Sequence, residues 1–108
     1  MKQNSAKAKS SSSKGALHAE RIQLALAREL AELFRDEIGD PALEGLRVLE
    51  VLLSKDGRHA RVHVAVRDSS ASSALQRATP FLRASLASNL SLERTPDLKF
   101  VLHPEGVT

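Results

Sequence analysis

The spacing of apolar residues changes several times along this chain, and the order of those changes limits the folds it can adopt. Apolar side chains have helical spacing in residues 16–38 and 70–90, and strand-like spacing in residues 46–54, 58–67 and 97–102. A chain of 108 residues can build one small core, so these elements must bury their apolar sides against one another. The sequence therefore predicts an α+β domain in which helices cover one face of a three-stranded sheet.

The first helix is predicted over residues 16–38. Gly39 suits the left-handed conformation that often ends a helix, and Pro41 cannot continue one. The apolar stripe that we expect to face the core consists of Ile22, Leu26, Leu30, Leu33, Phe34 and Ile38.

Residues 46–54 and 58–67 are predicted to form a β-hairpin. Gly57 lies in the short turn between them, where a positive φ favours glycine. In the first strand Val48 and Val51 differ in parity, so burying both requires a β-bulge near Leu49 and Glu50. The second strand alternates, with Ala60, Val62, Val64 and Val66 expected inward and His59, Arg61, His63 and Arg67 outward.

Pro80 lies in the middle of the second helical segment. A proline inside a helix loses a hydrogen bond, clashes with the preceding turn and costs roughly 3 kcal/mol. The sequence therefore predicts a broken helix, about 72–78 and 80–90, with Thr79 as N-cap and Pro80 as the first residue of the second piece. Because this segment joins the second and third strands, it suggests a crossover and a mixed sheet. The inward residues are expected to be Leu75, Ala78, Leu82 and Leu86, then Leu98, Phe100 and Leu102.

The beginning of the chain differs in composition from the rest. Residues 1–14 contain four lysines, no acid, many serines and too little apolar surface to fold. We predict a disordered tail over residues 1–14, either solvated or reaching phosphate as a basic arm, and a folded domain over residues 15–108. No apolar run follows the basic start, so neither a secretory signal nor a membrane span is expected. The absence of cysteine fits a cytoplasmic protein.

The sequence contains no pattern that is typical of an active site. The histidines do not have the spacing of a metal-ligand set, since His59 and His63 would be about 13 Å apart on a strand. Neither a G-x-S-x-G elbow nor a phosphate-binding or dinucleotide-binding glycine motif is present. We expect no enzymatic activity, no metal, no cofactor and no small-molecule substrate.

The charge of the folded part is polarised. Residues 15–57 contain five Lys or Arg and nine Asp or Glu, whereas residues 58–99 contain seven and three. A basic surface attracts phosphate, and a helix beginning at Pro80 would add free backbone N–H groups, so the second half is the expected RNA-binding side. The alternative is that its arginines are solvated or paired with carboxylates. The residues predicted to contact phosphate are Arg61, Arg67, Arg77, Arg83 and Lys99.

Aromatic residues are few, which argues against one mode of RNA recognition. The chain has three phenylalanines and neither tyrosine nor tryptophan. Phe34, Phe81 and Phe100 fall on apolar stripes or at the predicted break. A sheet that stacks bases on aromatic rings is therefore not expected, and contacts to phosphate and sugar are.

Several segments together resemble the ribosome-binding factor A family. Each segment is short, but their order and spacing are specific. They are Glu20-Arg21-Ile22, Asp40-Pro41-Ala42-Leu43, Val51 to Gly57, Ala60-Arg61-Val62, Phe81-Leu82-Arg83 and Thr95 to Phe100.

The resemblance implies a type II KH-like domain with the order helix, strand, strand, broken helix, strand. Members of the family have a kinked helix with the pattern Ala-x-Gly, which reads Ala78-Thr79-Pro80 here, so proline stands in place of glycine. Members are non-enzymatic and bind the small (30S) ribosomal subunit during its assembly. They support maturation of 16S rRNA and growth in the cold. The expected partners are the small subunit and its 16S rRNA, and the expected oligomeric state is a monomer.

The sequence is also compatible with two other functions. The chain could be a general KH-like RNA-binding module that is not tied to ribosomes. It could also be a protein-interaction domain that uses the acidic face of the first helix.

Overall fold

The protein forms a three-stranded sheet with two helices packed on one side. The structure is a computed structural model that describes residues 10–105. The elements are α2 (Ser10–Asp36), the short 3-10 helix η1 (Pro41–Leu43), β1 (Arg47–Leu53), β2 (His59–Val66), α3 (Ala71–Leu90) and β3 (Asp97–Pro104). This order confirms the predicted α+β class.

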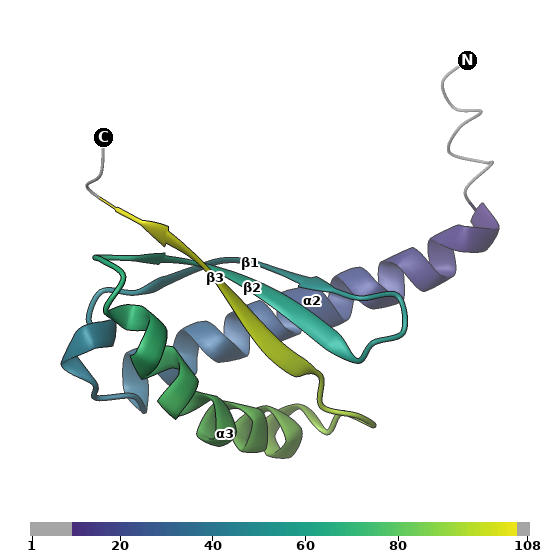
Figure 1. The fold of residues 1–108 in the computed structure, drawn as a ribbon. Helices are drawn as coiled ribbons and strands as arrows, with labels where there is room; N and C mark the ends of the chain where they lie inside the picture. The colour runs from purple at the N-terminus through teal and green to yellow at the C-terminus, as the bar shows by residue number, and fades with distance from the viewer. Residues whose placement is uncertain (1–9, 106–108) are drawn as a thin grey trace.

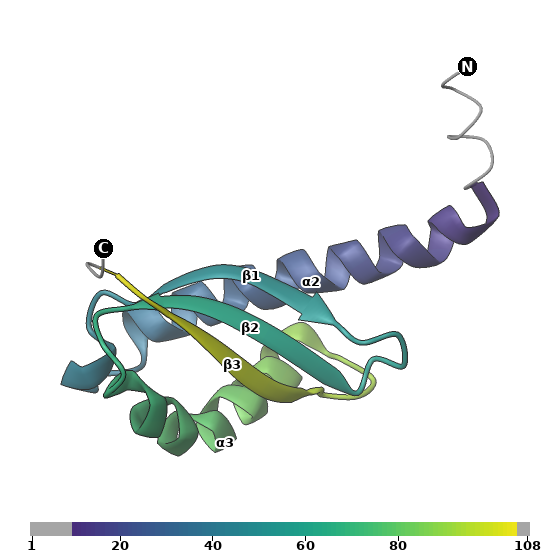
Figure 2. The same ribbon diagram turned by 45° about the horizontal axis from the view of Figure 1, so that its top comes forward.

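The sheet is mixed and has the strand order β1-β2-β3. β1 pairs antiparallel with β2, whereas β2 pairs parallel with β3 after the crossover through α3. Both helices lie on the same side of the sheet in Figures 1 and 2, and its other side has no layer over it. We call this uncovered side the outer face.

α2 begins earlier than the sequence suggested. Residues 10–14 of the predicted tail form its first turns, and residues 1–9 lie outside the described residues. The division into tail and domain stays a prediction. At the other end, the prediction of a left-handed Gly39 was wrong, because only Gly45, Gly57 and Ser91 have positive φ among the described residues.

The chain leaves α2 through a wide turn instead. The Ile38 N–H donates to the carbonyl of Leu33 at 3.0 Å. The Asp40 carboxylate then accepts from the N–H of Ala42 at 3.0 Å and caps η1, whose first residue is Pro41.

The hairpin confirms the predicted bulge and turn. The register of β1 against β2 shifts between Val48 and Glu50, which leaves Leu49 as the extra residue. Val51 is consequently buried at 3% exposure, while Leu49 is 47% exposed. Gly57 has φ 73° in the turn, where a side chain would be strained.

The prediction of two separate helices around Pro80 was wrong. α3 is one helix with Pro80 inside it, and Figure 1 shows it bending along its length. The Thr79 hydroxyl donates to the Leu75 carbonyl at 2.8 Å within the helix and caps no helix start. Pro80 and Gln76, whose carbonyl loses its usual donor, are both exposed, so water can replace the missing bond. Because α3 continues through Pro80, no second helix N-terminus is formed there to bind phosphate.

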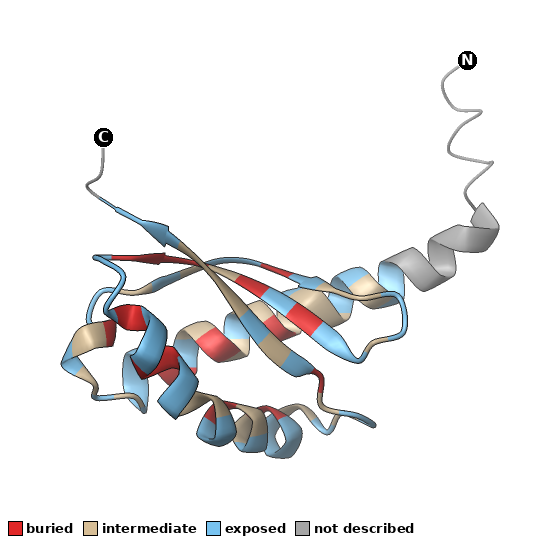
Figure 3. Cartoon of the chain, viewed as in Figure 1, coloured by how far each residue is buried: buried red, intermediate tan, exposed pale blue. Residues whose placement is uncertain are grey.

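The core lies between the sheet and the two helices (Figure 3). Leu26 and Leu30 of α2 and Leu82 and Leu86 of α3 are fully buried, in agreement with the predicted stripes. The inward residues of β2 are at most 2% exposed. Within residues 10–105, neither helix is long and apolar enough to span a membrane.

Candidate nucleic-acid interface

Arg61 and Lys99 meet at the centre of the outer face. They are register partners on the parallel strands β2 and β3, so their Cα atoms are one strand spacing apart, about 4.8 Å. Both are exposed, and neither has a carboxylate partner within the described residues. They border a shallow hollow of about 280 Å³ together with His59 and Leu52. We call Arg61 and Lys99 the basic pair.

Two histidines lie next to the basic pair on the same face. The Nδ1 of His63 and the Nε2 of His103 are 2.9 Å apart, so one ring donates a hydrogen bond to the other. The rings are stacked, with centroids 5.2 Å apart and planes at 27°. Within residues 10–105, nowhere do three or more potential metal ligands come together. The histidines therefore add hydrogen-bonding groups to this face.

The far end of the outer face is neutralised by an ion pair. Arg47 of β1 and Glu105, just after β3, bind each other across β2. Ala65, the register partner of Arg47, lies beneath this crossing and is only 3% exposed. Arg47 thus shares the face with the basic pair, but its charge is already balanced.

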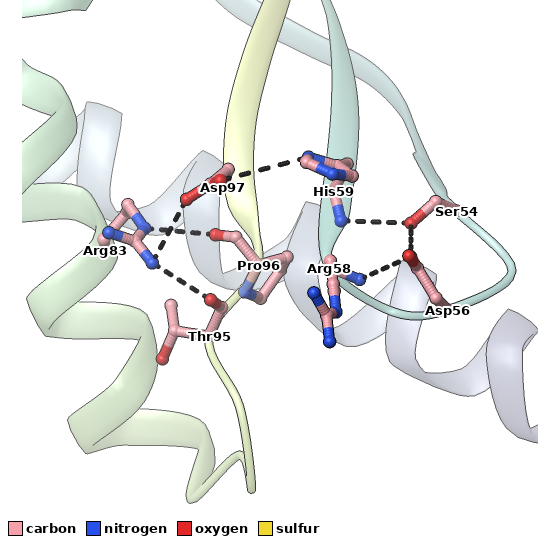
Figure 4. A network of polar contacts seen from close by, with 8 residues as sticks. All are labelled: Ser54, Asp56, Arg58, His59, Arg83, Thr95, Pro96 and Asp97. Carbon is pink, nitrogen blue, oxygen red and sulfur yellow. Dashed lines mark hydrogen bonds and ion pairs between the residues drawn. The ribbon is translucent and has the colours of Figure 1, made fainter.

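Arg83 is held by the protein itself (Figure 4). Its guanidinium donates to the carbonyls of Pro96 at 3.2 Å and Thr95 at 3.0 Å, and lies 3.4 Å from a carboxylate oxygen of Asp97. Arg83 was predicted to contact phosphate, but two of its guanidinium nitrogens donate to backbone carbonyls of the protein instead. Its donors connect α3 to the loop that leads into β3.

The other half of the network in Figure 4 holds the hairpin turn. The Asp56 carboxylate accepts from the Ser54 hydroxyl at 2.7 Å and from the Arg58 N–H at 3.0 Å. These bonds, Ser54 first, lower the pKa of Asp56 below its usual value. Asp97 lies between the two halves, because it also approaches His59 at 3.9 Å.

Replacing Arg83 with methionine is expected to lower the free energy of unfolding by about 1–2 kcal/mol. The variant keeps the aliphatic stem but leaves two backbone carbonyls without their charged donor. Equilibrium urea unfolding measures this change. The matched control, Arg35→Met, is expected to change stability by less than about 0.5 kcal/mol, because Arg35 pairs only with its neighbour Asp36 at the surface. Equal effects of the two substitutions would contradict the role of Arg83.

Arg77 and Arg67 lie away from the basic pair. Arg77 is on α3 and pairs with Asp40 at 3.0 Å, although its side chain remains 65% exposed. The pKa of Asp40 is lowered by the Ala42 N–H and then by Arg77. Arg67 is exposed just after β2. The pKa of the neighbouring Asp68 is lowered by hydrogen bonds from Ser70, with a smaller contribution from the charge of Arg67.

Of the five residues predicted to contact phosphate, the structure brings only Arg61 and Lys99 together. The predicted break at Ala78, Thr79 and Pro80 lies in α3, on the opposite side of the sheet from the basic pair. Arg47 and His103 were not predicted to lie on the outer face. Alternation along each strand would have placed both there, because each is next to an inward residue, Val48 or Leu102. Phe81 was expected at the break and is 45% exposed there, apart from the basic pair.

Comparison with known proteins identifies the family. The family model described as ribosome-binding factor A matches residues 18–105. The curated ribosome-binding factor A of Heliobacterium modesticaldum is 44% identical over 82 residues, which cover 70% of this chain and 67% of that protein. The chain belongs to the ribosome-binding factor A family. The counterpart from Halorhodospira halophila is 39% identical over 87 residues, covering 75% of this chain and 69% of that protein.

Solved structures of the ribosome-binding factor A family have the same fold. The crystal structure of the Thermus thermophilus protein matches with a TM-score of 0.72 and 35% identity, over 78% of this chain and 94% of that one. A homology model of the Thermus thermophilus factor, fitted into a cryo-EM map of a 30S–RbfA complex, matches with a TM-score of 0.67 and 36% identity, over 79% and 94%. The family assignment agrees with the prediction of a non-enzymatic protein, because the family is one of ribosome-binding factors.

Proposed function

We propose that this chain binds the small ribosomal subunit while the subunit is being assembled, and that it supports maturation of 16S rRNA. The observation that carries the proposal is the similarity, at 36% identity, to a factor that has been fitted into a 30S complex. The chain covers 94% of that factor. The two proteins therefore share nearly the whole of the folded domain.

The outer face is the proposed contact with rRNA. Neither member of the basic pair forms an ion pair among the described residues, although Glu50 and Asp97 share the face, and no helix covers it. The two stacked histidines beside the pair supply further hydrogen-bonding groups. Phosphate and sugar contacts are the expected mode, since none of the three phenylalanines is on this face.

Arg67 and Arg77 are proposed as secondary phosphate contacts. Both are exposed, but Arg67 lies at the end of β2 and Arg77 on the helical side. A single rRNA helix on the outer face would therefore reach Arg67 more readily than Arg77. Charge reversal at Arg77 is accordingly expected to weaken subunit binding less than charge reversal at Arg61.

Sedimentation tests the proposed partner. In a sucrose gradient of a bacterial lysate, the tagged full-length chain is expected to sediment with free small subunits and not with translating ribosomes. Migration only at the top of the gradient would contradict the proposal. If the chain instead bound short single-stranded RNA as tightly as it bound the subunit, a general KH-like RNA-binding module would be the better description.

Complementation tests the role in maturation. A bacterial strain that lacks its own family member is expected to accumulate 16S rRNA precursor and to grow poorly in the cold, and this chain is expected to restore both. Restored growth with an unchanged level of 16S rRNA precursor would contradict the proposed role in rRNA maturation.

A further inference from the structure

A groove between α2 and the edge strand β1 has an unusual lining. It is about 370 Å³ in volume and lies beside the free edge of the sheet. Its lining contains two acids and no basic residue. We call it the acidic groove, and it is formed by Glu20, Gln23, Leu24 and Ala27 of α2 and by Leu49, Glu50, Val51 and Leu52 of β1.

The acidic groove gathers most of the large apolar side chains that the fold leaves exposed. Leu24 is 65% exposed, Leu49 47% and Leu52 38%. These are three of the five exposed large hydrophobic residues within the described part of the chain. Isolated exposed leucines are common on protein surfaces, but several around one hollow are typical of an interaction site.

Charge decides which class of partner fits. Neither Glu20 nor Glu50 has an ion-pair partner within residues 10–105. The groove is lined by two carboxylates and no basic residue, which repels phosphate, so RNA is disfavoured within the groove itself. A second copy docked groove to groove would bring in two more carboxylates and no cation, which disfavours symmetric pairing as well.

The backbone of β1 limits how a partner can bind. The Leu53 N–H, at the free edge of the sheet, already donates to the side-chain oxygen of Gln23 at 2.8 Å. The bulge at Leu49 also interrupts the regular spacing of the edge. A full additional strand is therefore blocked, and recognition must come mainly from side chains seated on the leucines.

We propose that the acidic groove binds a basic segment of a protein partner, with aliphatic side chains resting on Leu24, Leu49 and Leu52 and flanking Lys or Arg paired with Glu20 and Glu50. This interaction adjoins the proposed rRNA contact, because Leu52 is the register partner of Arg61 and lines both hollows. The two surfaces differ in charge, since the groove is lined by acids and the rRNA contact by the basic pair. It does not depend on the chain binding the small subunit.

Two designed peptides test the proposal on the full-length chain. One alternates Lys with Val and Leu, and the other has Glu in every Lys position. Amide NMR spectra of the labelled chain are expected to shift around Leu24, Leu49 and Leu52 on addition of the basic peptide. Its affinity is expected to exceed that of the acidic peptide by about tenfold or more, since two surface ion pairs replace two repulsions.

Variants separate charge from apolar contact. The double variant Glu20→Gln/Glu50→Gln is expected to reduce the preference for the basic peptide to about twofold or less. Leu24→Ser is expected to weaken binding of the basic peptide about fivefold or more, whereas the matched control Leu17→Ser, an exposed leucine of α2 outside the groove, has no effect. All of these substitutions are at exposed positions, and unchanged thermal unfolding verifies that the fold is retained.

Several outcomes would overturn the proposal. Equal affinity for the two peptides would remove the charge argument, and amide shifts confined to other surfaces would remove the site. Shifts of the groove amides by a single-stranded oligouridine would assign the groove to RNA. Self-association abolished by Leu24→Ser would assign it to a second copy of the chain.

Discussion

Replacing Leu30 with alanine is expected to lower the free energy of unfolding by about 3 kcal/mol. Leu30 is fully buried on the stripe of α2 that faces the sheet, so the substitution removes apolar contacts and leaves a cavity. A loss of this size is a large part of the stability of a small domain. Equilibrium urea unfolding followed by circular dichroism measures it, and the slope of the transition should not change.

Leu24→Ala provides the matched control for this prediction. It removes the same atoms from the same helix at a position that is 65% exposed. Its effect is expected to stay below about 0.5 kcal/mol. If the two variants were equally destabilised, the division of α2 into a buried and an exposed side would be wrong.

Reversing both charges of the basic pair is expected to weaken binding to the small subunit by about 100-fold at moderate salt. Arg61→Glu/Lys99→Glu removes the two proposed phosphate contacts and adds two repulsions at one place on the outer face. The slope of log affinity against log salt concentration is expected to fall by about 2, one for each lost contact. Filter binding or fluorescence anisotropy over a range of salt concentrations measures both quantities.

The control for this variant makes the same change of charge elsewhere. Arg21→Glu/Arg28→Glu alters two exposed arginines of α2, which lies on the covered side of the sheet. It is expected to weaken binding by less than about threefold, through long-range charge alone. If the control lost as much affinity as the outer-face variant, binding would depend on net charge and the outer face would not be the contact.

Much of the fold was predictable because the spacing of apolar residues along the chain matches the faces that helices and strands bury. The alternation of β2 placed Val62 and Val64 inside, and the change of parity between Val48 and Val51 predicted the bulge. The prediction at Pro80 was wrong because it considered only the local cost of a proline in a helix and not the packing of the helix against the core. Leu75 and Leu82 are buried on either side of it, and their burial outweighs a lost bond at the exposed surface.

The site was predictable only in part. Alternation correctly placed Arg61 on the outward side of β2, but its proximity to Lys99 depends on a parallel register that no local pattern shows. Arg83 looked like a surface cation, since sequence does not reveal that the carbonyls of Thr95 and Pro96 turn toward α3. The acidic groove likewise depends on how α2 crosses β1, which periodicity alone does not give.

The parallel pairing of β2 with β3 has a consequence for the order in which this protein folds. The hairpin needs only residues up to 66, but the other edge of β2 finds its partner only when the whole of α3 and β3 is available. Until then the strand that ends up central is an edge strand, rich in valine and open to pairing with other chains. A released chain truncated within α3 should therefore aggregate or recruit chaperones, whereas the full-length chain should not.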